Sequence, residues 1–201
     1  LFSATMPRDI VALAQSHMKL PLRVEIAPPG TTIDKVTQEL YCVQKNDTPR
    51  LLEKILNEYR GSILIFSRTK FGAKKIAVII RALGHSAVEI HSNRSLGQRI
   101  EAMNGFRNGK YRILVATDIA ARGIDVKGIE LVLNYDLPES PEDYVHRIGR
   151  TGRAGQIGHA ISFATPDQKR DVHGIERLIR LALPLSKLPV LPQARASAYG
   201  E

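Results

Sequence analysis

The sequence predicts an α/β protein built around a doubly wound, mainly parallel sheet. Short, continuous apolar runs at 63–66, 113–116 and 131–133 are typical of parallel strands buried on both faces. Segments with helical spacing alternate with these runs through short connections, which favours a single sheet covered by helices on both faces. Polar residues follow several of the runs directly, at the strand ends where such sheets bind ligands.

Composition sets the size and the charge of this domain. The chain has 201 residues, of which 43% are hydrophobic, enough for one domain with a full core. Its formal net charge of +9 favours a polyanionic partner, although composition alone fits a merely basic protein equally well. No membrane span or signal peptide is predicted. Because the first residue is Leu1 rather than Met, we expect a fragment of a longer protein.

A single cysteine, Cys42, excludes an internal disulfide and a cysteine zinc cluster. This usage suits a reducing, cytoplasmic location, and the alternating sequence around Cys42 predicts that its side chain packs on a strand. The histidines show no metal-ligand spacing, so no metal site is predicted in the chain itself.

The N-terminal third contains a linker and the first elements of the predicted domain. Residues 1–5 resemble the end of a buried strand, and a helix begins near Pro7. Proline-rich composition predicts a linker over 21–36, with a short strand at 23–26. A strand follows at 37–43. A helix then runs from Thr48 to Gly61, with Leu51, Leu52, Ile55, Leu56 and Tyr59 facing inward.

Helix starts and stops are marked in the middle of the chain. Thr69 opens a helix that Gly84 ends, and strands are predicted at 87–90 and 113–116. Ser95 opens the next helix in a capping box with Gln98, and its inward residues are Ile100, Met103 and Phe106.

The last third continues the alternation. After the run at 131–133, Ser140 caps a helix in which Pro141 occupies the first turn and Asp143 suits a capping box. A strand at 160–163 precedes a helix over 167–183 with a basic outer face. Prolines at 184, 189 and 192 predict an extended tail over 184–201.

The segment 146–155 combines three arginines with three glycines. Glycine lets the backbone approach a ligand, and arginine offers a planar fork that matches phosphate oxygens. Because Arg150 and Arg153 are three residues apart, a tight turn could aim both at one anion. The alternative is a solvated basic turn without a ligand.

Four motifs, in order, resemble those of the DEAD-box RNA helicases. They are Ser3-Ala4-Thr5, the segment 64–70, the segment Ala116-Thr117-Asp118 to Asp125, and His146-Arg147-Ile148-Gly149-Arg150-Thr151-Gly152-Arg153. The similarity extends from Leu1 to about Asp167. The segment His91-Ser92-Asn93-Arg94-Ser95 resembles the bacterial RhlE-like subgroup.

This resemblance implies a RecA-like C-terminal domain over 37–183, a linker over 21–36 and a remnant of the first RecA-like domain over 1–20. The sequence contains no Gly-x-x-x-x-Gly-Lys-[Ser/Thr] loop and no Asp-Glu-Ala-Asp motif. The resemblance implies that the phosphate loop, the acids that bind Mg²⁺ and the adenine pocket belong to the first domain. The chain is therefore expected to be inactive alone.

The resemblance also implies residue roles around ATP. Asp125, after the turn at Gly123, would accept a hydrogen bond from the ribose, and Arg150 and Arg153 would contact the γ-phosphate as catalytic arginine fingers. The alternative for Asp125 is a turn aspartate that bonds its own backbone. Interdomain contacts are expected from Ser3, Thr5, His146 and Arg147.

RNA contacts are implied for Thr69, Thr117, Arg94 and Arg99. Both threonines also suit helix caps, which need no ligand. Leu96 stands where the family has a glutamine, which puts one RNA contact in doubt.

The expected function is that of an ATP-dependent RNA helicase, with ATP and Mg²⁺ as cofactors. Its expected partners are RNA and the first domain of the same chain, and no membrane. The alternatives are a non-enzymatic RNA-binding module and a DNA-directed helicase. The motifs Ala-Arg-Gly-x-Asp at 121–125 and His-Arg-Ile-Gly-Arg at 146–150 favour an RNA helicase over a DNA-directed one.

Overall fold

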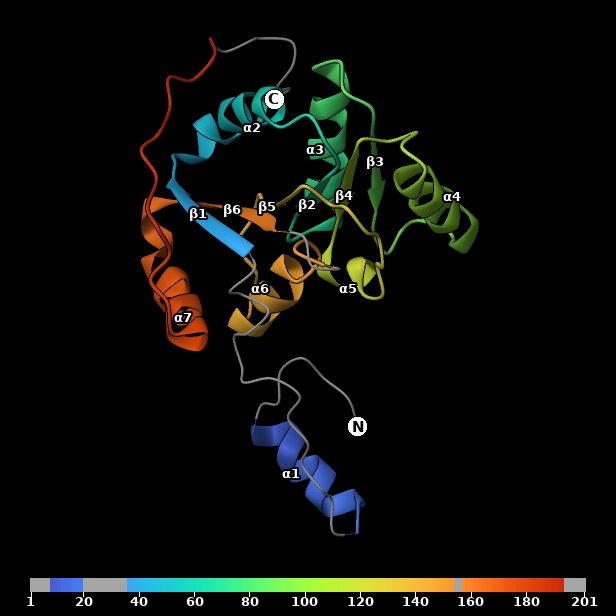
Figure 1. The fold of residues 1–201 in the computed structure, drawn as a ribbon, viewed down its shortest axis with the longest axis vertical. Coiled ribbons are helices and arrows are strands. Elements are labelled where there is room, and N and C mark those ends of the chain that lie inside the picture. The colour runs from blue at the N-terminus through green and yellow to red at the C-terminus, as the bar shows by residue number, and fades with distance from the viewer. Residues whose placement is uncertain (1–7, 20–35, 154–156, 194–201) are drawn as a thin grey trace.

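A single parallel sheet organises the domain (Figure 1). The computed structural model describes residues 8–19, 36–153 and 157–193. In these ranges the sheet has six strands in the order β1-β6-β5-β2-β4-β3, and every pair is parallel. The strands are β1 (Val36–Cys42), β2 (Ile63–Phe66), β3 (Ala87–Ile90), β4 (Ile113–Ala116), β5 (Leu131–Asn134) and β6 (Gly158–Ala164). The predicted doubly wound α/β class is confirmed.

Helices cover both faces of the sheet. On one face, α2 (Thr48–Glu58) and α3 (Lys70–Ala82) bury their apolar stripes against alternate residues of β2, β4, β5 and β6. On the other face lie α4 (Leu96–Arg107) and the short α5 (Asp118–Ala121), packed on β2, β3 and β4. The same face carries α6 (Pro141–Ile148) and α7 (Lys169–Ile179), packed around β1 and β6.

Most predicted helix boundaries are confirmed by their capping groups. Thr69 Oγ accepts from the Gly72 N–H, and Ser95 forms a reciprocal capping box with Gln98. Gly84, at φ 86°, follows the C-cap of α3, as expected for a left-handed stop. Ser140 caps α6, because its hydroxyl oxygen accepts from the Asp143 N–H. The Asp143 carboxylate accepts from the Ser140 hydroxyl rather than from the Ser140 N–H, so the predicted capping box is not completed.

Three local predictions are wrong. The helix predicted over 167–183 divides into a 3₁₀ turn, Pro166–Gln168, and α7, which ends at Ile179 because Arg180 adopts a left-handed φ of 56°. Ile100 is 52% exposed rather than inward. Cys42 lies at the end of β1 with its side chain exposed, not packed.

The C-terminal segment 184–193 is attached to the domain rather than merely extended. The Leu40 N–H donates to the Pro184 carbonyl and the Ser186 N–H donates to the Leu40 carbonyl, each at 2.9 Å. Further along, Arg50 Nε donates to the Pro192 carbonyl at 2.7 Å, and Leu191 packs against the core beside α2. The segment thus lies along the outer edge of β1 (Figure 1).

The N-terminal part is described only for α1 (Arg8–His17) and the two residues that follow it. Ser3, Thr5 and the strand predicted at 23–26 lie outside the described residues. None of the helices in the described ranges is long and apolar enough to cross a membrane.

Candidate nucleotide and nucleic-acid site

The predicted RNA-contact residues follow three neighbouring strands. Thr69 follows β2, Thr117 follows β4, and the segment 91–94 follows β3, in the spatial order β2-β4-β3. Because the strands are parallel, their carboxyl ends meet at one edge of the sheet. The structure therefore brings these predicted contacts together along a single track.

The two threonines on this track differ in whether their side chains form a helix-capping hydrogen bond. Thr69 is exposed, and its hydroxyl oxygen accepts from the Gly72 N–H at 2.9 Å. A side chain at Gly72 would lie 2.5 Å from Ser67 Oγ and 3.1 Å from Thr69 Oγ, so this turn requires glycine. Thr117 is half-buried at the N-cap of α5, and its side chain makes no capping bond. The hydroxyl of Thr117 is thus the freer of the two for a ligand.

Arg94 is oriented toward the protein. One of its terminal nitrogens forms an ion pair with Glu89, and Arg81 pairs with the same carboxylate at 3.0 Å. Burial tends to raise the pKa of Glu89, but the hydrogen bonds from Arg81 and Arg94 outweigh it, so the pKa lies below its ordinary value. Because this carboxylate is buried, Arg94 is a poorer candidate for RNA phosphate than predicted.

Arg99 lies half-exposed on α4, beside a groove of about 360 Å³ that runs between α4 and the segment 120–124. The groove has a mixed lining, with apolar residues such as Leu96 and Ile100 and with the basic Arg99, Arg107 and Arg122. Leu96 is 72% exposed, so the residue that replaces the expected glutamine presents an apolar surface here.

The predicted ATP-contact residues gather at a second location, formed by the turn at 122–125 and the end of α6. Gly123 adopts φ 78°, and the following Asp125 presents a carboxylate that is 79% exposed. Arg153 Nη1 lies 2.8 Å from Asp125 Oδ1, while Arg153 Nε donates to the Gly149 carbonyl at 2.8 Å. The loop backbone therefore fixes Arg153 against Asp125.

Arg150 shares this location. Its Nη1 donates to the Ile124 carbonyl at 2.8 Å and its Nε to the His146 carbonyl at 3.2 Å. Burial, together with the nearby charge of Arg153, lowers the pKa of Arg150 below its ordinary value. Both guanidinium groups donate to the Ile124 carbonyl, and Asp125 offsets only one of the two positive charges, so an anion would relieve the remaining charge. Their arrangement fits the predicted phosphate contact.

Arg147, for which an interdomain contact is predicted, has a side chain that is only 1% exposed. Its Nε donates to Asp118 Oδ1 at 2.6 Å and its Nη2 donates to Asp118 Oδ2 at 2.7 Å. Its Nη1 donates to the Asp136 carbonyl at 2.6 Å and to Asn134 Oδ1 at 3.2 Å. All of these acceptors belong to the same domain, so Arg147 anchors α6 to the sheet. Its interdomain role stays a prediction.

His146, on the same helix, is partly exposed, and its Nδ1 lies 4.0 Å from Asp143 Oδ1. It lines a small cavity of about 50 Å³ together with Arg122, Arg147 and Arg150. Its predicted interdomain role stays a prediction. Within the described ranges, no group of three or more His, Cys, Asp or Glu side chains could hold a metal ion.

Sequence reasoning missed Asp136 and the exposed Phe71. Asp136 Oδ2 accepts from Ser67 Oγ and from the Arg68 N–H, each at 2.9 Å, which ties the end of β5 to the end of β2. Its position two residues after a buried strand could have suggested this role. Phe71, beside Thr69, is 73% exposed.

The geometry agrees with a match between residues 47–155 and the helicase conserved C-terminal domain family. The chain belongs to this family. The matched segment contains both groups of site residues, from Thr69 on the strand-edge track to Arg153 beside Asp125. The expected ATP-side and RNA-side residues thus lie on one helicase C-terminal domain.

Relatives of this helicase domain are DEAD-box proteins. The chain is 43% identical over 180 residues to the ATP-dependent RNA helicase DbpA of Bacillus subtilis, covering 89% of this chain and 38% of DbpA. A DEAD-box protein from the hyperthermophile Methanococcus jannaschii superposes with a TM-score of 0.74 at 38% identity, covering 92% of this chain and 50% of that one. Dbp5 of S. cerevisiae, bound to RNA and ADP BeF3, gives 0.85 at 28% identity over 92% of this chain and 50% of that one. The helicase domain therefore spans half or less of these proteins.

Proposed function

We propose that the chain is the C-terminal half of an ATP-dependent RNA helicase, which remodels short RNA duplexes by closing with a first RecA-like domain over ATP and RNA. The observation that carries the proposal is the grouping of Arg150 and Arg153 at the Asp125 turn. A pure RNA-binding module has no use for a paired arginine site beside a ribose-type carboxylate, and this favours the enzyme over the non-enzymatic alternative.

On the ATP side, Asp125 would accept from the ribose, and the turn at Gly123 would hold its carboxylate outward. Arg150 and Arg153 would act as catalytic residues that stabilise charge on the γ-phosphate. ATP would supply the hydrolysable phosphoanhydride bond, and Mg²⁺ would be held by the acids of the first domain. His146 would contact that domain from α6.

On the RNA side, Thr117, Thr69 and Arg99 would contact the sugar-phosphate backbone along the carboxyl ends of β2, β4 and β3. Contacts of this kind position the strand but do not read its sequence. We therefore propose binding that is independent of sequence, with Arg99 rather than Arg94 as the main basic contact.

Two finer assignments belong to the same proposal. Affiliation with the RhlE-like subgroup is supported by the segment 91–95 alone, and the relatives named above carry other names. A cytoplasmic location is supported by the single cysteine, Cys42.

The 201-residue chain alone is expected to hydrolyse no ATP. The reason is that its sequence lacks the phosphate-cradling loop and the DEAD acids, so it supplies only part of a composite site. A phosphate-release assay with and without RNA checks this, with a two-domain relative as the positive control. RNA-stimulated turnover by the chain alone would contradict the composite-site proposal.

The chain is also expected to bind single-stranded RNA weakly, with an affinity that falls steeply as salt rises, because phosphate contacts release counterions. Arg99→Ala should weaken binding by roughly three- to tenfold and reduce the salt slope by about 1. Fluorescence anisotropy at several salt concentrations measures both. Arg177→Ala, an exposed change on α7, is the matched control. An RNA affinity that does not depend on salt, or an equal loss of affinity in Arg99→Ala and Arg177→Ala, would contradict the proposed RNA contacts.

A further inference from the structure

Phe71 is unusual among the aromatic side chains of this domain. It is 73% exposed, whereas every other phenylalanine or tyrosine in the described ranges is buried or half-buried. A single exposed apolar residue is ordinary on a protein surface, so exposure alone indicates nothing. What distinguishes Phe71 is its position two residues after Thr69, at the edge where the track of proposed RNA contacts begins.

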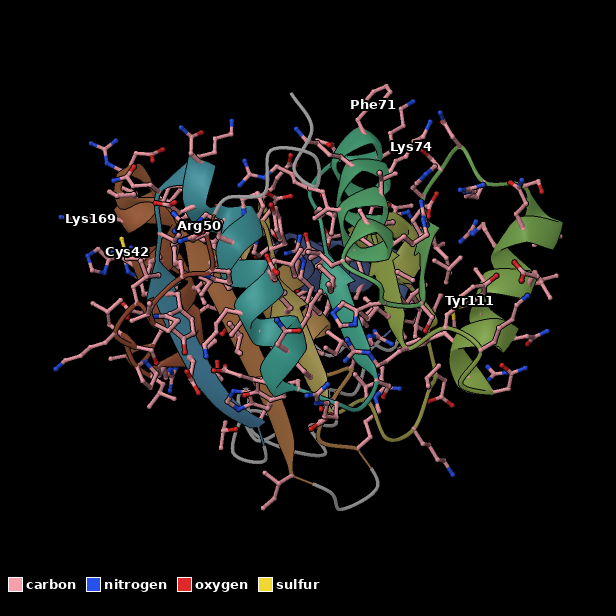
Figure 2. All side chains as sticks on the ribbon, turned by 90° about the horizontal axis from the view of Figure 1, so that it is seen from above. Cys42, Arg50, Phe71, Lys74, Tyr111 and Lys169 are labelled. Atoms are coloured by element: carbon pink, nitrogen blue, oxygen red, sulfur yellow. The ribbon has the colours of Figure 1, made fainter. Side chains whose placement is uncertain are left out.

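A cation lies over this ring. Lys70 Nζ lies 5.2 Å from the centroid of the Phe71 ring and also donates to Asn93 Oδ1 at 3.2 Å. The lysine thus joins Phe71 to the segment that follows β3. Lys74, on the next turn of α3, is exposed as well, and Figure 2 shows Phe71 and Lys74 projecting from the same outer side of this helix. An aromatic face flanked by ammonium groups suits a nucleobase and its phosphate.

A buried polar group lies next to this surface. His91 is 6% exposed, and within the described ranges neither of its ring nitrogens has a hydrogen-bond partner. Burial first, and then the charge of Arg94, lower the pKa of His91, with smaller contributions from Lys70 and Lys74. A lowered pKa favours the neutral imidazole, which can donate from one nitrogen and accept at the other. Buried polar groups normally have partners, so this ring marks the corner between α3 and β3 as a place for a polar ligand.

We propose that Phe71 is a base-stacking platform that holds one nucleobase of single-stranded RNA, with Lys70 and Lys74 contacting the adjoining phosphates. This inference rests on the proposed RNA binding and extends it, because the other contacts on the track go to the backbone and none offers an aromatic face. Every base has such a face, so the platform tolerates any sequence but requires a base. It would let the domain distinguish a nucleobase-bearing strand from a bare polyanion.

Base-dependent affinity is the property to measure. The full chain is titrated with a fluorescein-labelled oligouridylate of about ten nucleotides, and with the same oligonucleotide carrying abasic riboses. Phe71→Ala should weaken binding of the oligouridylate roughly five- to tenfold and leave binding of the abasic strand unchanged. Phe71→Tyr should retain affinity and Phe71→Leu should not. Val78→Ala, on an exposed residue of the same helix, is the matched control and should bind both strands like the wild-type chain.

A direct optical signal complements the affinities. The sequence contains no tryptophan, so Phe71→Trp introduces a single indole at the proposed platform. Its fluorescence should be quenched when oligouridylate binds and unchanged when the abasic strand binds.

The outcomes separate this inference from the function on which it rests. If the wild-type chain binds neither strand, the proposed RNA binding fails and the platform fails with it. If it binds RNA in a salt-dependent way but Phe71→Ala is silent, or weakens both strands equally, the platform alone is overturned. If Phe71→Ala does not change RNA binding, a protein partner becomes the candidate for contact with the exposed ring.

Discussion

Arg147→Met is expected to lower the free energy of unfolding of the domain by about 3 kcal/mol. This is the lower end of the cost of removing one member of a buried ion pair, because the Asp118 side chain is 28% exposed. Methionine keeps much of the volume but none of the donors. It leaves the Asp118 carboxylate, the Asn134 amide oxygen and the Asp136 carbonyl without the guanidinium that satisfies them. It also removes the cation that lies 5.0 Å from the centre of the Phe66 ring. Urea unfolding followed by circular dichroism measures the change.

The double variant Arg147→Met, Asp118→Leu serves as the control for this pair. Replacing both partners removes the uncompensated charge, so the double variant should lose less stability than the sum of the two single variants. Arg177→Met, on an exposed arginine, should change stability by no more than about 0.5 kcal/mol. A loss below about 1 kcal/mol for Arg147→Met, or strict additivity of the pair, would contradict the role assigned to Arg147.

Arg153→Lys, in an enzyme that carries both RecA-like domains, is expected to reduce kcat for RNA-stimulated ATP hydrolysis at least about tenfold, a loss of roughly 1.4 kcal/mol of transition-state stabilisation. Lysine keeps the charge but loses the planar fork. In the structure this fork contacts the Gly149 carbonyl and the Asp125 carboxylate from different nitrogens, which a single ammonium group reproduces poorly. Arginine fingers contribute on the order of 10³-fold or more in related chemistry, so lysine should recover only part of the rate.

The affinity for RNA without nucleotide is the control for Arg153→Lys and should barely change, because the residue lies at the Asp125 turn and not on the strand-edge track. Wild-type kcat in this variant would remove Arg153 from the ATP site. A parallel loss of nucleotide-free RNA affinity would instead assign it to the RNA side.

Local signals are sufficient to predict most of the fold. The central strands are predictable because parallel strands buried on both faces are continuous apolar runs, as 63–66 and 113–116 are. Helix starts at Thr69 and Ser95 are predictable because capping depends on residues only three positions apart. The grouping of Thr69, Thr117 and the 91–94 segment follows from the parallel topology itself.

Tertiary contacts decide the features that sequence reasoning does not predict. An interdomain contact is predicted for Arg147 together with its neighbours, but its acceptors lie 11 to 29 residues away in sequence and meet it only in the folded sheet. An RNA contact is predicted for Arg94, but its ion pair with Glu89 depends on how the chain turns after β3, which the sequence does not indicate. The end of α7 is misplaced because no glycine or proline marks the left-handed Arg180.

The C-terminal segment along β1 changes where the domain can be cut. The family match covers residues 47–155, yet β1, β6 and the segment 184–193 all lie outside it and belong to the same sheet or its edge. A chain trimmed to the matched residues would lose two strands and leave β5 as a bare edge, a template for pairing with other chains. Even a cut after Leu183 would remove the hydrogen-bond partners of the Leu40 N–H and carbonyl at the edge of the sheet. It would also remove the Pro192 carbonyl that accepts from Arg50 Nε. A purification tag is therefore better placed beyond residue 193 than at the end of α7.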